Sequence, residues 1–571
     1  MSGEPYDLVI RGGSVVDGTG APPFVADVGV RDGRIAAVGT IAGKGFREID
    51  ATGKIVTPGF VDVHTHYDGQ ITWENRLAPS SGHGVTTVVM GNCGVGFAPV
   101  RQGDQDLVIK LMEGVEDIPD VVMAEGVPFD WESFPDYLDA LDKRPSDIDF
   151  CAQLPHSPLR VFVMGERALS EHATEADRAE MRRLTREAID AGAFGVSSSR
   201  NLFHRFRSGT VAPSVNSAEE ELLALAAGLR DAGAGVFQCN PVIDADARDE
   251  LALFERIIEA SGRPLNFSLT WYPVRPENWD RYVDALKTYA ERGIEIRGQF
   301  IPRPVGMLFG LDLSFHSFSL NPSYRPIQHL PLAEKVAAMR DPELRARLIA
   351  EEPEDPNPGF VAIARMANNF VPLSDPVDYH ATGEMTAITA ARRGVPEREV
   401  IYDELLKDDG RAILWWPANM ITDYLDLTVP LFDIDNAVVA LGDGGAHYAL
   451  LCDASYPSYL LTQRLGRDGL DLPALIRLLS SAPAASLGLD DRGIVAPGYK
   501  ADLNVIDLDG MVLRRPSTKT DLPAGGKRLT QTASGYAATI VSGVVTYRDG
   551  EPTGELPGRL VRGAQPAPAG T

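Results

Sequence analysis

Hydrophobic residues in the central part of the chain occur in short runs, separated by longer stretches in which apolar residues recur every three or four positions. The short runs indicate buried strands, and the three-to-four spacing indicates amphipathic helices. The strand candidates are residues 55–63, 86–90, 149–154, 192–198, 235–240, 264–270, 295–301 and 438–442. Helical patterns at 175–191, 217–232 and 249–260 lie between strand candidates. This alternation predicts an α/β fold, and the strand count is that of a (β/α)8 TIM barrel.

The two ends of the chain show another pattern, of short strands interrupted by turn residues. Near the start these are 6–10, 15–16, 28–30 and 35–38, and near the other end 500–507, 537–542 and 544–547. Neither set can close a core alone, so we expect the ends to meet in one composite β-sandwich domain. The expected divisions are 1–54 for the first half of the sandwich, 55–487 for the barrel, and 488–571 for the second half and a C-terminal tail.

The last two barrel strand candidates are unusually far apart in the sequence. One ends at residue 301 and the next begins at residue 438, and a single crossover helix needs far fewer residues. We therefore expect residues from about 303 to 396 to form an insertion over the barrel mouth, where it could act as a lid.

Composition narrows the class of protein. With 571 residues, 44% apolar and 23% charged, the chain is typical of a globular enzyme. The 54 basic and 80 acidic residues give a net charge of −26, which opposes nucleic-acid binding. No basic leader precedes an apolar segment and no apolar run could span a bilayer, so we expect a cytoplasmic protein without membrane contact. The four cysteines form no CxxC pair, so neither a disulfide framework nor a structural zinc knot is expected.

The strongest chemical signal is Thr57-Pro-Gly-Phe-Val-Asp-Val-His64-Thr-His66, at the end of the first barrel strand candidate. Because side chains alternate along a strand, His64 and His66 point to the same side. TIM-barrel enzymes place their chemistry at the carboxyl ends of the strands, and two converging imidazoles suit zinc or a similar metal. Elsewhere in a chain the same His-x-His pair would indicate only surface or core histidines, and the strand-end position favours a metal site.

A second signal, Ala440-Leu-Gly-Asp443-Gly-Gly-Ala-His447, follows the eighth strand candidate. The glycines allow a sharp bend that brings Asp443 to the mouth, where its carboxylate could ligate a metal and accept a proton from bound water. An ordinary Asp-Gly turn is the alternative. His447 either contacts substrate or caps the loop.

A third signal, Val89-Met-Gly-Asn-Cys93-Gly-Val-Gly-Phe, follows the second strand candidate. A thiolate is a good soft metal ligand, and the glycines would permit close approach. A free buried cysteine is the alternative.

These segments resemble the amidohydrolase superfamily, and within it the N-acyl-D-amino-acid deacylase (D-aminoacylase) branch. The resemblance covers nearly the whole chain and is carried by DLVIRGGSVVDGTG, VTPGFVDVHTHYDGQ, GVTTVVMGNCGVGFAP, LPHSPLRVFVMG, GAFGVSSS, LGDGG and GIVAPGYKADLNVID. In that branch two strand-one histidines and the strand-eight aspartate belong to the metal centre, a cysteine after strand two replaces a bridging lysine, and the aspartate is the general base. The resemblance implies these roles for His64, His66, Cys93 and Asp443.

The chain departs from the family pattern at strands five and six. The family has one histidine on each, whereas the sequence here reads Gly235-Val-Phe-Gln-Cys-Asn240 and Leu265-Asn-Phe-Ser-Leu-Thr270. Amide and hydroxyl oxygens are poor substitutes for imidazoles as zinc ligands. We therefore expect one zinc ion rather than two, bound by His64, His66 and Asp443, with Cys93 as a candidate fourth contact.

Five residues are candidates for substrate binding. They are His156 and Arg160 after strand three, Gln238 on strand five, Arg303 after strand seven, and His447. A guanidinium such as that of Arg303 suits a carboxylate, although a surface arginine is an equal alternative.

The assignments predict hydrolysis of an N-acyl amide. A bound metal would activate water and polarise the carbonyl, while Asp443 would accept the proton and pass it to the departing amine. The partner is then a small-molecule N-acyl amide, and the resemblance allows a homo-oligomer. Two alternatives stay open: a hydrolase of cyclic or lipophilic amides on the same scaffold, and a degenerate barrel that binds a small molecule without catalysis.

Overall fold

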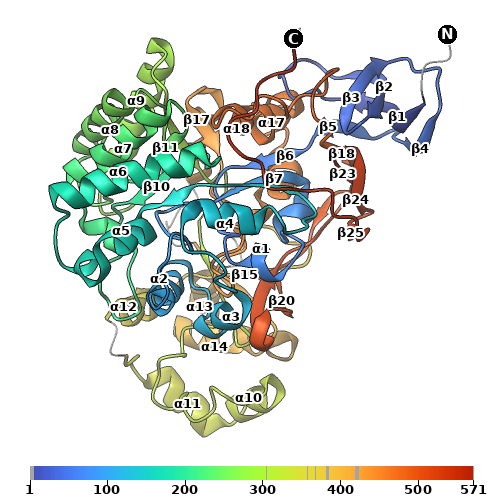
Figure 1. The fold of residues 1–571 in the computed structure, drawn as a ribbon. Coiled ribbons are helices and arrows are strands. Elements are labelled where there is room, and N and C mark those ends of the chain that lie inside the picture. The colour runs from blue at the N-terminus through green and yellow to red at the C-terminus, as the bar shows by residue number, and fades with distance from the viewer. Residues whose placement is uncertain are drawn as a thin grey trace.

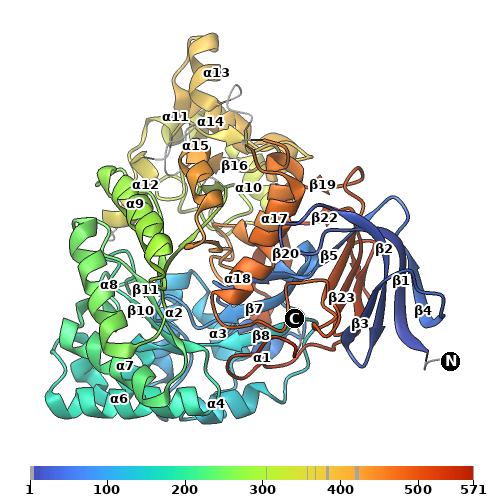
Figure 2. The same ribbon diagram turned by 90° about the horizontal axis from the view of Figure 1, so that it is seen from above.

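The computed structural model describes residues 5–303, 305–355, 358–366, 368–380, 385–417, 424–467 and 469–569. It has an α/β region and, beside it, a β-rich region that contains strands from both ends of the chain (Figures 1 and 2). Among the described residues, no helix combines the length and the apolar character that crossing a membrane requires.

The α/β region is built on two parallel sheets. The first has the order β6 (Phe60–Asp62), β7 (Val85–Met90), β8 (Asp149–Ala152). The second has the order β9 (Leu154–Pro155), β10 (Gly195–Ser199), β11 (Val236–Asn240), β12 (Leu265–Ser268), β13 (Ile296–Phe300), β17 (Ala437–Val439). Only Gln153 separates β8 from β9, so one sheet continues into the other. The eight predicted strand positions are confirmed in their predicted order.

Backbone hydrogen bonds connect the two outermost parallel strands beyond their ends. The N–H of Asp443 donates to the carbonyl of His64 (3.3 Å), and the N–H of His66 donates to the carbonyl of Gly444 (2.8 Å). The segments that follow β6 and β17 therefore lie side by side.

Helices cover the outer side of the parallel strands (Figure 2). They include α4 (Phe134–Leu141), α5 (His156–Met164), α6 (Glu175–Asp190), α7 (Glu219–Ala232), α8 (Ala247–Ser261), α9 (Glu277–Arg292), α17 (Leu472–Leu479) and α18 (Ser481–Ala485). Helices α2 (Gln105–Glu116) and α3 (Asp120–Gly126) follow β7 in the chain, and α2 ends beside His66 and His447. The predicted helices at 175–191, 217–232 and 249–260 correspond to α6, α7 and α8. Helix α6 begins at a capping box, in which Thr174 and Asp177 satisfy each other's backbone N–H groups.

The β-rich region is a nine-stranded sheet shared by both chain ends. Its order is β25 (Glu551–Pro552), β24 (Val544–Arg548), β23 (Tyr536–Val541), β18 (Leu503–Ile506), β5 (Ile55–Pro58), β1 (Tyr6–Val15), β2 (Phe24–Arg31), β3 (Arg34–Gly39), with β4 (Gly45–Asp50) also beside β1. The two ends therefore meet, as the turn-rich patterns predicted. Backbone pairing joins all nine strands into one sheet rather than two, and a bulge between Ile10 and Gly13 interrupts the register of β1.

The first predicted barrel strand, 55–63, is in fact two strands. Residues Ile55–Pro58 pair with β1 and β18 in the nine-stranded sheet, and only Phe60–Asp62 pair with β7. Between them Gly59 donates its backbone N–H to the carbonyl of Asp502 (2.8 Å), and a Cβ there would come within 2.2 Å of Thr86 Oγ1. The chain therefore changes sheets at a position that only glycine can occupy without a clash.

A third structural unit lies between β13 and β17 and projects from the α/β region (Figure 2). It contains α10 (Leu332–Met339), α11 (Pro342–Ala350), α12 (Pro358–Met366), α13 (Thr386–Arg393), α14 (Glu397–Leu405) and the sheet β14 (Met307–Phe309), β16 (Leu414–Trp416), β15 (Val371–Pro372). Its own hydrophobic cluster extends from Phe309 to Trp416, further along the chain than the expected boundary near residue 396. Its role as a lid stays a prediction.

Candidate metal centre

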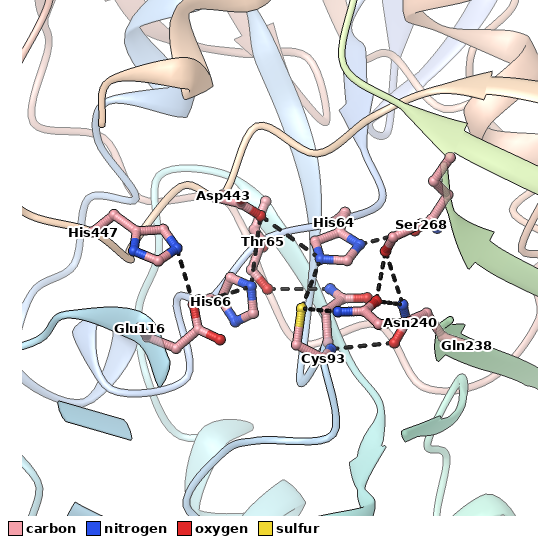
Figure 3. A network of polar contacts seen from close by, with 12 residues as sticks. His64, Thr65, His66, Cys93, Glu116, Gln238, Asn240, Ser268, Asp443 and His447 are labelled. Atoms are coloured by element: carbon pink, nitrogen blue, oxygen red, sulfur yellow. Dashed lines mark hydrogen bonds and ion pairs between the residues drawn. The ribbon is translucent and has the colours of Figure 1, made fainter. Parts of the chain in front are cut away.

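Three loops that follow β6, β7 and β17 bring His64, His66, Cys93 and Asp443 together (Figure 3). The candidate ligand atoms of His64, His66 and Cys93 lie within 4.8 Å of one another, and all three side chains are buried. Asp443 Oδ1 is 3.7 Å from His64 Nε2 and 3.6 Å from His66 Nε2. The structure therefore groups all four residues that the sequence assigned to the metal.

The backbone at two of these residues adopts the left-handed region, with φ of 57° at Cys93 and 46° at Asp443. Such values are uncommon outside glycine and turn each side chain toward the centre. The neighbouring glycines are required by space, because a Cβ at Gly444 would come within 2.5 Å of the Tyr67 hydroxyl and one at Gly445 within 2.7 Å of the His66 carbonyl oxygen. The Gly-rich sequence motifs thus permit the close approach of these loops.

The donor atoms fit one divalent cation. Two ligand atoms that each lie about 2.1 Å from a tetrahedral zinc ion are about 3.4 Å apart. The separations here are 3.2 Å from His64 Nε2 to Cys93 Sγ and 3.6 to 3.7 Å from the two imidazoles to Asp443. Imidazole nitrogen, carboxylate oxygen and thiolate sulfur are all ordinary zinc ligands.

A second contact orients His64 for this role. Its Nδ1 lies 2.8 Å from Gln299 Oε1, so that Nδ1 carries the proton and the lone pair of Nε2 faces the cluster and the Cys93 sulfur. Burial lowers the pKa of His64 to about 4, which keeps the ring neutral. Neutral imidazole is the form that binds metal.

The electrostatics of Asp443 and Cys93 differ from those of His64. Burial alone would raise the pKa of Asp443, but the close approach of His66 and the attraction of the other nearby imidazoles bring it below its usual range. Burial raises the pKa of Cys93 to about 11, so that only a neighbouring cation would favour its thiolate. Asp443 is thus a preformed anion, and Cys93 ionises if metal is bound.

The residues in place of the strand-five and strand-six histidines contact Cys93 and one another. Asn240 Nδ2 donates to Cys93 Sγ (3.2 Å), and Gln238 Oε1 accepts from the Cys93 backbone N–H (3.2 Å). Ser268 Oγ and Gln238 Nε2 both donate to Asn240 Oδ1, at 2.6 and 2.9 Å. Gln238, predicted to bind substrate, therefore lies beside the centre, and its amide group hydrogen bonds with the Cys93 backbone and with Asn240.

His156 and Arg160, also predicted to bind substrate, instead form hydrogen bonds with the buried carboxylate of Glu221. Glu221 Oε1 lies 2.8 Å from both His156 Nε2 and Arg160 Nε, and Ser198 Oγ lies 2.9 Å from His156 Nδ1. Arg160 also donates to the carbonyls of Ala168 and Glu171. His156 and Arg160 are 0% and 1% exposed. Packing and hydrogen bonding account for both side chains without a ligand.

Arg303 is buried rather than on the surface. Its guanidinium donates to the Ser455 hydroxyl (3.0 Å), lies 3.3 Å from Asp453 Oδ1 and stacks over the Tyr379 ring at 4.1 Å. His447, by contrast, keeps 24% of its side chain exposed beside the centre. Of the five substrate candidates, His447 has the placement closest to the expectation.

Glu116 was missed by the sequence analysis. It is the last residue of α2, and its Oε2 lies 3.5 Å from His66 Nε2 and 3.7 Å from His447 Nε2. One feature of the sequence could have indicated it. Glu116 follows Val108 and Met112 at helical spacing and is the acidic residue on an otherwise apolar helix face.

Comparison with known proteins agrees with this geometry. The sequence profile described as Amidohydrolase family matches residues 47–547. The chain belongs to the amidohydrolase family, which confirms the resemblance inferred from the sequence motifs.

Individual relatives and solved structures are similar over different lengths. The chain is 27% identical to N-acyl-D-aspartate deacylase of Alcaligenes xylosoxydans xylosoxydans, covering 97% of this chain and 95% of that one. It is 37% identical to D-aminoacylase of the same organism, but over only 34% of this chain and 38% of that one. In structure it is similar to N-acyl-D-glutamate deacylase of Bordetella bronchiseptica, with a TM-score of 0.62 and 24% identity over 98% of this chain and 100% of the other. That likeness supports the fold.

Proposed function

We propose that the chain is a zinc-dependent hydrolase of N-acyl amides, similar in activity to the N-acyl-D-amino-acid deacylases. The observation that carries this proposal is the convergence of His64, His66 and Asp443 on one point at the ends of parallel strands. Full-length relatives are named N-acyl-D-aspartate and N-acyl-D-glutamate deacylase. One ion is proposed rather than two, because neutral groups that hydrogen bond with Cys93 and one another stand where the family has two more histidines.

The scaffold proposed for this centre is a (β/α)8 barrel with a β-domain formed by both chain ends. The proposed domains follow the expected divisions 1–54, 55–487 and 488–571, except that residues 55–58 belong to the nine-stranded sheet, and the unit after β13 is the proposed lid. Support comes from eight parallel strand positions and from the hydrogen bonds of Asp443 and Gly444 to the segment after β6. A solved D-aminoacylase structure is similar with a TM-score of 0.61 and 23% identity over 98% of this chain. A cytoplasmic location and a homo-oligomer stay predictions from the sequence.

In the proposed reaction, His64, His66 and Asp443 hold the cation, with Cys93 as a fourth contact. A bound divalent cation would supply a Lewis acid and would lower the pKa of a coordinated water. Asp443 accepts a proton from the attacking water as its oxygen bonds to the amide carbon, and then delivers this proton to the nitrogen as the C–N bond breaks. The products are a carboxylate and an amine. His447, the partly exposed side chain at the site, is the proposed substrate contact.

A substrate panel tests the proposal. Zinc-loaded protein is assayed on N-acetyl-D-glutamate and N-acetyl-D-aspartate, their L enantiomers, a hydantoin and a long-chain acyl amide. The proposal expects hydrolysis of the D substrates that stops on chelation. Preferential hydrolysis of the hydantoin or of the acyl amide would favour the alternative hydrolase, and binding without turnover would favour a non-catalytic barrel.

A further inference from the structure

Glu116 is a buried carboxylate placed against the metal centre. Glu116 is the last residue of α2, and its side chain lies between His66 and His447 (Figure 3). Val108, Met112 and Glu116 share one buried face of the helix, and Asp117 ends it with a left-handed φ of 52°. The carboxylate is 2% exposed.

This carboxylate has no fixed positive partner. Among the described residues, only the imidazoles of His66 and His447 form ion pairs with it, and its Oε1 has no hydrogen bond. Glu113, one turn earlier on the same helix, pairs with Arg207 at 3.2 Å. Burying a carboxylate is costly unless it is paired, hydrogen bonded or bound to a metal. Apart from these two imidazoles, Glu116 has no charged partner among the described side chains.

The distance from Glu116 to His66 is compatible with two ligands of one metal ion. Hydrogen bonds from N–H to oxygen are usually about 2.7 to 3.2 Å long, and the 3.5 Å from Glu116 Oε2 to His66 Nε2 is longer. It is close to the roughly 3.4 Å between two atoms that bind one tetrahedral zinc ion. His66 Nε2 has the same relationship to Asp443 Oδ1, at 3.6 Å. The two carboxylates thus approach the same nitrogen at ligand spacing.

We infer that Glu116 is a further ligand of the cation at this centre, a carboxylate from helix α2 that compensates for the histidines absent from strands five and six. This inference rests on the proposed function, and adds a residue that neither the motifs nor the family pattern indicated. Zinc accepts carboxylate oxygen and imidazole nitrogen alike. The backbone N–H of His447 donates to the Glu116 carbonyl (2.6 Å), which ties the loop after β17 to the end of the same helix.

The test compares Glu116→Gln with Glu113→Gln, a matched change one turn away on α2. Each purified protein is stripped with a chelator, and the zinc dissociation constant is measured by competition with a zinc-binding dye. Loss of a partner outside the ligand shell typically weakens metal binding by about 10- to 100-fold, so loss of a ligand should weaken it by at least about 100-fold. Glu113→Gln should bind zinc as the wild type does.

Thermal stability gives a second readout. Stripped Glu116→Gln should unfold at or above the temperature of the stripped wild type, because a buried carboxyl with an unsatisfied oxygen is replaced, whereas added zinc should raise its unfolding temperature less. If Glu116→Gln fails to fold, Glu116→Asp, which keeps the charge but is one methylene shorter, should fold and show the weakened zinc affinity. If a folded Glu116 variant binds zinc as tightly as the wild type, Glu116 is not a ligand, and the proposed function is unaffected. A wild-type chain that takes up no divalent cation would overturn the proposed function as well.

Discussion

Asp443 Oδ1 lies 3.6 Å from His66 Nε2, although these residues follow the last and the first of the parallel strands. The relationship is fixed by the backbone, because the N–H of His66 donates to the carbonyl of Gly444 and the N–H of Asp443 to the carbonyl of His64. The candidate base therefore has a defined position relative to both imidazoles, and its removal should affect chemistry rather than folding.

Asp443→Asn should fold and bind zinc more weakly, and it should lose turnover even at zinc concentrations that fill its site. The amide is close in shape to the carboxylate but cannot accept the proton from water, and a positioned general base typically contributes about 10²- to 10⁴-fold in rate. The measurement is kcat on the best D substrate, with zinc content determined on the same sample. Asp435→Asn, at a largely exposed position paired with Arg477, is the control. Wild-type turnover in Asp443→Asn would remove this residue from the mechanism.

Cys93→Ser should reduce affinity for cadmium more than for manganese. Sulfur is a soft ligand that favours cadmium, whereas manganese prefers oxygen. Competition titrations of both ions against a chelating dye measure the difference. Cys151→Ser, at a cysteine buried in β8, controls for the general effect of the substitution. Equal weakening for the two ions would show that the Cys93 sulfur is not a ligand.

Glu221→Gln should destabilise the protein by about 3 to 5 kcal/mol, because it leaves the buried guanidinium of Arg160 without its carboxylate. Urea unfolding measures the loss, and Glu220→Gln at the exposed neighbouring position should cause little change. The kcat/KM of the folded fraction should stay at the wild-type value. A lower kcat/KM without lower stability would instead support substrate binding by His156 and Arg160.

The pair of Asp177 with Arg167 should produce acid-dependent stability. Hydrogen bonds from Arg167 and Thr174 lower the pKa of Asp177 to about 2 from an ordinary 3.8. A carboxyl with a lowered folded pKa stabilises the fold fully above its unfolded pKa and loses this effect as the pH falls from about 4 to about 2. The difference in unfolding temperature between the wild type and Asp177→Asn should therefore be largest above pH 5 and shrink toward pH 3. A difference that is constant over this range would contradict the assignment.

Much of the fold and four of the site residues could be predicted because they depend on local periodicity. Alternation along a strand places His64 and His66 on one side, and strand ends of a parallel sheet lie at one edge, which brings in Cys93 and Asp443. The strand 55–63 was predicted as one element because hydrophobicity does not reveal that residues before Gly59 pair with β18, which is far away in the sequence.

Contacts across the interior could not be predicted in the same way. That Glu221 satisfies His156 and Arg160 depends on how α7 packs against α5, and that Asn240 reaches Cys93 depends on the exact course of two loops. Glu116 belongs to the same class, since no motif surrounds it and only the packing of α2 brings it to His66.

Zinc titration of chelator-stripped protein, with hydrolysis of an N-acyl-D-amino acid as the readout, tests the central claim most directly. We expect no hydrolysis in the stripped protein, and a rise that levels off at about one zinc ion per chain, since three strand-end side chains form one site. His64→Asn should show no such rise at the same zinc concentrations. Hydrolysis that persists without metal, or a His64→Asn variant that titrates like the wild type, would contradict a cation held by His64, His66 and Asp443.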